Sequence, residues 1–324
     1  MRRAAGSTQD LSPAEYLQRP EVSARIREYC GLAPDSDSSC VYLAGMGVRD
    51  GPRAHWGQVS AQPPSALTDL LAHGDDIARS MWDTDSLLLF FDVDFIDSDD
   101  AGEAIVHPAD TFLLLEPTYC GLCDVLDELR MPLLDLMTGA GYGFVGRVSL
   151  HGPAAARLEA LAPAAPAWFQ THERRRPGWT RRPLNEHQAR AHHGLGLVLE
   201  YLAHKVLRRA APASEVPVVV DNTVVGAGGV HRACVSLDLT HMGDPLDSRH
   251  LRVAFGLYQK HRLRPDLVGP LASQLVPALA VVPRERRPLL EALESRRLSR
   301  AATLARGGSG RIPGRRLRAR MPVG

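Results

Sequence analysis

The sequence predicts an α+β fold in which a mixed β-sheet is flanked by helices. Three observations lead to this prediction. Segments with apolar residues at helical spacing alternate along the chain with short apolar runs typical of buried strands. Hydrophobic residues make up 44% of the 324 residues, which is enough for a proper core. No apolar run approaches the roughly 20 residues that a membrane-spanning helix requires, so we expect no membrane partner.

Four segments have helical patterns. Residues 12–32 begin with Ser12 as a candidate N-cap, followed by a proline at the first helical position. Residues 64–82 and 185–210 carry apolar side chains at helical spacing, and the second of these is the longest predicted helix. Residues 267–298 predict closing helices that prolines interrupt.

The predicted strands are short and rich in Val, Leu and Phe. The clearest is residues 87–95, where five consecutive large apolar residues run into Asp92 and Asp94. Residues 133–150 predict two strands around a glycine turn. Further strands are predicted at residues 40–48, 216–226, 232–239 and 251–258.

The two acids at the end of the apolar run are the first candidate site. Residues two apart in a strand face the same side, so Asp92 and Asp94 present neighbouring carboxylates. Like charges repel unless a cation lies between them, and Mg²⁺ or Mn²⁺ prefers such oxygen ligands. The alternative is an Asp-rich turn at the strand end, because Asp97, Asp99 and Asp100 follow.

A third acid and several basic residues come later in the chain. Asp238 lies inside another apolar alternation, and three carboxylates from two strands are the set that a two-metal phosphoryl-transfer site requires. Arg249, Arg252 and Lys260 follow and would supply positive charge for a polyphosphate. Between the acids, "LMTGAGYGF" could bring backbone N–H groups close to phosphate oxygens. A glycine turn between strands explains that segment equally well.

The order of these motifs resembles the archaeo-eukaryotic primase superfamily, which includes the catalytic small subunit of DNA primases and the primase-polymerases of mobile elements. The matching segments are "LLLFFDVDFIDSDD", "YCGLCD", "TGAGYGF" and "SLDLTHMGDPLDSRHLRVAFGLYQKH". Together they cover roughly residues 85–150 and 231–262, which is under a third of the chain.

The resemblance implies a primase-polymerase-like catalytic core and template-dependent nucleotidyl transfer. Asp92, Asp94 and Asp238 would be the catalytic residues and would bind Mg²⁺ or Mn²⁺. The implied partners are a single-stranded DNA template, nucleoside triphosphates, and a primase large subunit or a helicase. The residues that would contact the incoming nucleotide are Thr138, Gly139, Arg249, Arg252 and Lys260.

The chain departs from the family pattern in its nucleotide-binding motifs. Gly143 stands where the family has a histidine, and Ala254, Gly256 and Tyr258 replace a proline, a serine and a histidine. Three histidines are candidate substitutes: His241, His250 and His261. The alternative function is therefore a catalytically degenerate, primase-like subunit that binds nucleic acid within a replication or mobile-element assembly. An unrelated metal-dependent enzyme, such as a nuclease, also stays open.

The family carries a zinc knuckle near the place of "YCGLCD". Cys120 and Cys123 supply only half of a four-ligand zinc site, and His107 is the nearest further candidate. The alternative is two buried free cysteines at the start of a helix. Five cysteines, an odd number without a disulfide pattern, favour a reducing, cytoplasmic setting.

The C-terminal end is strongly basic. From Arg284 onward the chain has twelve arginines against three glutamates, and residues 306–324 have six arginines and no acid among Gly and Pro. Such composition predicts a flexible tail, either attracting phosphate backbones or only aiding solubility. The sequence thus divides into four regions. Residues 1–40 are an N-terminal helical segment, and residues 41–265 are the catalytic core, with the candidate zinc knuckle at 107–123. Residues 266–305 form C-terminal helices, and residues 306–324 are this tail.

Overall fold

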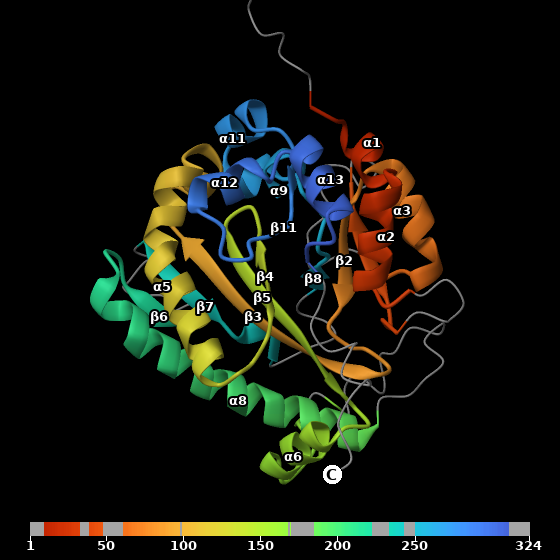
Figure 1. Ribbon diagram of the computed structural model, residues 1–324, viewed down its shortest axis with the longest axis vertical. Helices are drawn as coiled ribbons and strands as arrows, with labels where there is room; N and C mark the ends of the chain where they lie inside the picture. Colours follow the sequence, from red (N-terminus) through yellow and green to blue (C-terminus); the bar gives the residue numbers. More distant parts are fainter. Residues whose placement is uncertain are drawn as a thin grey trace, which may run out of the picture.

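A six-stranded mixed sheet forms the centre of the fold (Figure 1). The computed structural model describes residues 10–32, 39–47, 61–97, 99–167, 169, 185–221, 233–242 and 250–310. The strand order is β11-β4-β5-β3-β7-β6, and every neighbouring pair is antiparallel except β6 and β7. The strands are β3 (Ser86–Ile96), β4 (Leu134–Met137), β5 (Gly141–Ser149), β6 (Val218–Val220), β7 (Cys234–Asp238) and β11 (Val282–Pro283). The predicted mixed sheet flanked by helices is confirmed.

Two long helices, α5 (Pro108–Glu128) and α8 (Glu186–Ala210), cover one face of this sheet and pack against each other. The alternation along β3 explains the two faces: Phe91 and Val93 are buried beneath these helices in the main hydrophobic core, while Asp92 and Asp94 face the other side. Helix α6 (Pro153–Leu161) packs on α8.

A second, three-stranded sheet lies across from the acidic face of β3. It has the order β1 (Leu43–Met46), β2 (Asp76–Ser80) and β8 (His250–Arg252), and the short β9 (Leu257–Tyr258) pairs with β10 (Leu279–Ala280) beside it. Helices α1 (Pro13–Leu17), α2 (Pro20–Tyr29) and α13 (Leu298–Arg306) contact one another, to the right of the centre in Figure 1. The remaining short helices are α3 (Leu67–His73), α4 (Glu103–Val106), α9 (Lys260–Leu263), α10 (Pro265–Val268), α11 (Pro270–Leu275) and α12 (Leu289–Glu294), with 3₁₀ turns η3 (Pro64–Ala66), η4 (Ala211–Ala213) and η5 (Thr240–Met242).

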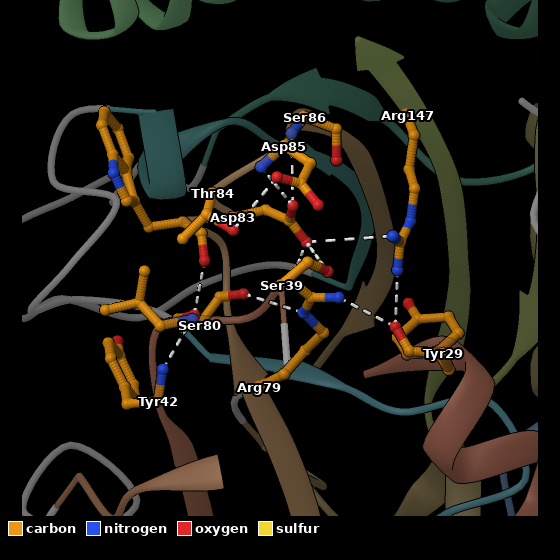
Figure 2. Close-up of polar contacts among 12 residues, drawn as sticks. Tyr29, Ser39, Tyr42, Arg79, Ser80, Asp83, Thr84, Asp85, Ser86 and Arg147 are labelled. Atoms are coloured by element: carbon orange, nitrogen blue, oxygen red, sulfur yellow. Dashed lines mark hydrogen bonds and ion pairs between the residues drawn. The ribbon is translucent and has the colours of Figure 1, made fainter. Parts of the chain in front are cut away.

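A buried polar network joins α2 to the two sheets (Figure 2). Arg79 of β2 and Asp83 are both fully buried and form an ion pair of 2.6 Å between Nη2 and Oδ2. Arg79 and Arg147 of β5 both donate to the carbonyl of Tyr29, at 2.8 and 2.7 Å. The hydroxyl of Ser39 also donates to Asp83. Burial alone would raise the pKa of Asp83, but the charges of Arg79 and Arg147 outweigh it and hold the pKa below its usual value.

Several predicted elements are confirmed. The long helix at 185–210 is α8, which begins after Asn185, whose side chain accepts from the Gln188 N–H. Ser12 caps α1 as expected, forming a capping box with Glu15. The strands predicted at 87–95, 133–150 and 232–239 correspond to β3, to β4 with β5, and to β7. The predicted strands at 40–48 and 216–226 are shorter in the structure, as β1 and β6, and their last residues, from 48 and from 222, lie outside the described residues.

Other predictions were wrong in part. The helix predicted over 64–82 ends at Gly74, which has a φ of 74°, and β2 follows. All five β2 residues are buried, so the strand lacks the polar–apolar alternation that would have identified it. The helix predicted over 12–32 breaks at Pro20, because a residue before proline disfavours the helical conformation.

Three further predictions differ from the structure. The segment 251–258 forms β8 and β9, separated at Phe255 with a φ of 62°. The predicted closing helices contain the short strands β10 and β11. Arg306, expected in the tail, ends α13 and pairs with Glu21, while residues 311–324 of the tail lie outside the described residues. Among the described helices, none is long and apolar enough to cross a membrane.

Candidate active site

Strand pairing brings the three predicted acids together. In the antiparallel register of β3 and β7, Asp92 lies directly opposite Asp238, and Asp94 is two residues further along on the same face. One carboxylate oxygen from each of the three lies within 4.8 Å of the others. In the part of the chain that the structure describes, this is the one group of three or more His, Cys, Asp or Glu residues with metal-ligand geometry.

The arrangement fits a divalent cation. Oxygens bound to Mg²⁺ lie about 2.1 Å from the ion, so ligands of one ion are separated by up to ~4 Å, and a pair of ions spans slightly more. Asp92 and Asp94 are half-buried, and Asp238 is 7% exposed. The backbone N–H and the hydroxyl of Thr240 donate to Oδ1 of Asp238, at 2.8 and 2.6 Å, which fixes the orientation of this carboxylate.

The acids line a cleft of about 300 Å³ between the two sheets. Thr138, Arg252 and Lys260, three of the predicted nucleotide-binding residues, line the same cleft. Gly139 does not line it; a Cβ at this position would come within 2.3 Å of the Tyr258 ring, so only glycine fits here. Arg249 lies outside the described residues.

The Arg252 side chain packs against an aromatic ring that also lines the cleft. Its guanidinium lies 4.4 Å from the centre of the Tyr258 ring, a cation–π contact. Burial raises the pKa of Tyr258 to about 12, so the phenol stays neutral at physiological pH. Burial also raises the pKa of the nearby Asp76 to about 6, although the charge of Arg252 opposes the shift. The positive charge of Arg252 at the cleft thus lies near the buried carboxyl group of Asp76.

The space beside Gly143 of β5 is filled by a neighbouring ring. Gly143 lies opposite Asp92, and a Cβ there would meet the ring of Phe90 at 2.8 Å. The His241 ring packs edge-on against Phe90 at 5.3 Å, and its Nε2 donates to the Phe90 carbonyl at 3.0 Å. His241 of η5 therefore lines the cleft next to Phe90.

The other two candidate histidines differ in position. His250 lines the cleft, with its Nδ1 3.1 Å from the hydroxyl of Tyr42. His261 is fully buried and does not line the cleft; its Nε2 lies 3.0 Å from the carbonyl of Pro277. Burial lowers the pKa of His261, which keeps its ring neutral.

The described residues do not form the predicted zinc site. Cys120 and Cys123 lie in the second half of α5, whereas His107 precedes its first turn, roughly 20 Å away along the helix axis. No third His, Cys, Asp or Glu of the described ranges joins the two cysteines. Burial raises the pKa of Cys123 to about 11, so its thiolate is disfavoured. The alternative, two buried free cysteines at a helix start, is correct in part: both cysteines are free and Cys123 is buried, but Cys120 is exposed and both lie in the second half of α5.

Two features of the cleft escaped the sequence analysis. Ala101, Ala104, Leu267 and Val268 also line it, although none belongs to a motif. Arg296 contacts the backbone of the Thr138 turn from the C-terminal region. The run "ESRRLS" around Arg296 offers no signal for this contact, because it reads as an exposed helical surface.

No family model and no curated protein matches this sequence. The fold is similar to the polymerase domain of ligase D from Mycobacterium tuberculosis, solved in complex with DNA. The TM-score is 0.48 with 11% sequence identity, and the alignment covers 91% of this chain and 88% of that chain.

Proposed function

We propose that this protein is a nucleotidyltransferase of the primase-polymerase type, which extends or starts a nucleic-acid strand on a single-stranded template. The observation that carries the proposal is the register of β3 and β7. It places three carboxylates at one point of a cleft whose opposite wall presents Arg252 and Lys260. The order of the motifs along the chain, which resembles that of the primases, supports the same function.

Each side of the cleft has a separate role in this proposal. Asp92, Asp94 and Asp238 hold Mg²⁺ or Mn²⁺, and these acids would repel one another strongly without a cation. When bound, the metal supplies charge neutralisation at the phosphates and activation of a 3′-hydroxyl. Arg252 and Lys260 attract the negative charge of a nucleoside triphosphate.

The separation of charges favours a metal–triphosphate complex over a simple anion or cation. The three carboxylates attract a divalent cation and would repel a free anion, whereas Arg252 and Lys260 attract an anion. A complex of Mg²⁺ with a nucleoside triphosphate presents both signs of charge at once. The cleft therefore matches this class of ligand best.

The test is incorporation of labelled ribo- or deoxyribonucleotides on a single-stranded DNA template, with Mg²⁺ or Mn²⁺. We expect incorporation by the unaltered protein and its loss in Asp92→Ala and Asp238→Ala. Asp99→Ala is the matched control, because Asp99 is an exposed acid that follows β3 and does not line the cleft. Incorporation that survives in both triad variants would refute the proposal.

A second candidate function rests on the filled space at Gly143. Phe90 occupies the volume that a residue-143 side chain would need, so a family contact has been lost on β5. A protein that binds single-stranded DNA with its cleft and arginine-rich tail, but incorporates no nucleotide under any metal condition, would be the degenerate binding subunit. The assay above, combined with a DNA-binding measurement, separates the two functions.

A further inference from the structure

Arg296 is a buried arginine between α12 and α13 that none of the sequence motifs includes. Only 3% of it is exposed, and its guanidinium lies 5.0 Å from the centre of the Phe112 ring. Its Nη1 donates to the carbonyl of Thr138 at 3.0 Å and to that of Gly139 at 3.4 Å. The side chain thus reaches the turn between β4 and β5 and does not line the cleft.

The positive charge of Arg296 has no acidic partner among the described residues, and its Nε has no hydrogen-bond partner there. Burial lowers the pKa of this guanidinium to about 10. The comparable Arg284, also buried, forms an ion pair with Glu116 and contacts the Tyr119 and Tyr142 rings. Burying a charge without a counter-charge raises the free energy of the folded state, so the buried charge of Arg296 indicates a function.

The geometry of the turn supplies one. In a trans peptide the N–H points away from the C=O, so the carbonyls of Thr138 and Gly139, which face Arg296, direct the N–H groups of Gly139 and Ala140 to the other side. Gly139 itself does not line the cleft, but Thr138 and Ala140 on either side of it do, so these N–H groups face toward the cleft. The Ala140 N–H makes a long bond of 3.4 Å to the Thr138 hydroxyl, and no described residue accepts from the Gly139 N–H.

The same turn lies beside the acids. The N–H of Phe95 donates to the Ala140 carbonyl at 3.2 Å, and Gly141 pairs with Asp94 across β3 and β5. Successive backbone N–H groups at such a turn form a concave site for anions. An anion seated there would lie between the metal ligands and the buried guanidinium.

We propose that Arg296 is a positioning residue for the phosphates of a nucleoside triphosphate: it holds the 138–140 turn with its N–H groups directed into the cleft, and it places a positive charge behind them. This inference rests on the proposed function. The isolated charge acquires its counter-charge only when the anionic ligand binds, which explains why no carboxylate neutralises it beforehand.

The test measures binding of inorganic tripolyphosphate with Mg²⁺ by calorimetry, for the unaltered protein and two variants. Arg296→Gln keeps a donor but removes the charge, so we expect about tenfold weaker binding or more. Arg296→Lys keeps the charge and should lose only about threefold. Mn²⁺ affinity in the absence of phosphate should stay unchanged in both variants, because neither touches the acids.

Arg284→Gln is the matched control, since Arg284 is a buried arginine that does not contact the turn. It should lower the melting temperature and leave tripolyphosphate binding unchanged. Equal affinities for the unaltered protein, Arg296→Gln and Arg296→Lys would overturn the role of Arg296 while leaving the proposed function standing. If the unaltered protein binds neither tripolyphosphate nor a nucleoside triphosphate, the proposed function itself fails, and this inference fails with it.

A measurement on the unaltered protein keeps the inference testable if the variants do not fold. The Gly139 amide proton should move downfield in the NMR spectrum when tripolyphosphate is added, because it gains an anionic acceptor. The Gly152 amide, which already donates to the Ser149 carbonyl at 3.1 Å, should not move. An unchanged Gly139 resonance at saturating tripolyphosphate would contradict the proposal.

Discussion

Two clusters of charge lie at the two ends of β3, and they are built in opposite ways. Before its first residue, Asp83 is fully buried and receives hydrogen bonds from Arg79 and Ser39 and from the backbone of Asp85 and Ser86. Near its other end, the register sets three carboxylates of one sign within 4.8 Å of one another. In the first cluster the buried carboxylate of Asp83 lies next to two arginines of opposite charge. The second gathers carboxylates of one sign, which a bound divalent cation would neutralise.

The difference shows which buried charges serve structure and which serve function. Removing one member of a compensated cluster leaves another charge buried and unpaired, which costs stability. Removing one member of a cluster of like charges relieves repulsion, so stability should be kept while binding is lost. The same contrast separates Arg284, paired with Glu116, from Arg296, which has no acidic partner among the described residues.

The largest effect is expected at Asp238. Asp238→Ala should reduce nucleotide incorporation by about a thousandfold or more, since metal-assisted charge stabilisation contributes several kcal/mol. Its melting temperature without metal should equal or exceed that of the unaltered protein. Incorporation kinetics and calorimetry check both parts; a melting temperature that falls steeply would mean that Asp238 belongs to the structural class.

The opposite outcome is expected at Asp83. Asp83→Ala should destabilise the fold by about 3–5 kcal/mol, because Arg79 would stay buried without its counter-charge. Denaturant unfolding measures this, with Asp85→Ala as the control, because the Asp85 side chain lies at the surface. The folded-state pKa of Asp83 is depressed, so its contribution is present above pH ~4 and is lost as the pH falls further. A loss of less than ~1 kcal/mol in Asp83→Ala would break the comparison.

The sequence predicts the second cluster better than the first. Asp92 and Asp94 can be recognised from the sequence, because alternation with a period of two residues is visible within a short segment. A charged acid within an apolar strand also stands out from its neighbours. Asp238 follows the same rule, and only the pairing of β3 with β7, a contact between distant segments, brings it to the others. Asp83 and Arg79 lie only four residues apart, but they give no comparable signal because their further partners Tyr29, Ser39 and Arg147 come from distant segments.

The missed elements have physical reasons of the same kind. Strand β2 is buried on both faces, so its sequence lacks alternation and resembles a continuation of α3. Helix α5 contains Pro117 and the CxxC, which suggested a metal knuckle instead of a helix. The contact of Arg296 with the Thr138 turn depends on how the C-terminal helices pack, and no local pattern encodes that packing.

A smaller effect should appear at Asp76, an acid buried next to the basic side of the cleft. Its pKa is about 6 in the folded protein and about 3.8 when exposed, so the folded state binds the proton more tightly. Stability should therefore fall as the pH rises from about 4 to 6 and then level off. Asp76→Asn removes this loss and should stabilise the protein by about 1–3 kcal/mol at pH 8 and by little at pH 4. Melting temperatures of Asp76→Asn and the unaltered protein at pH 8 and pH 4 test this. An equal gain in stability at both pH values would contradict a raised pKa of Asp76.

The smallest effect is expected at Gly143. Gly143→Ala should cost about 1 kcal/mol, because its Cβ meets the Phe90 ring, which must shift. Phe90→Ala should abolish most of that cost in the double variant, as a double-mutant cycle of unfolding free energies would measure. An additive cycle would show that Phe90 does not occupy the space beside residue 143.

The most direct test of the central claim is Mn²⁺ binding, followed by electron paramagnetic resonance. Asp92, Asp94 and Asp238 are held together, so the unaltered protein should bind Mn²⁺ at this cluster. Asp92→Asn with Asp238→Asn should lose that binding while remaining folded, and Asp99→Ala should keep it. Equal Mn²⁺ binding by the unaltered protein and the double variant would contradict the account, because the three carboxylates would then not be the metal site.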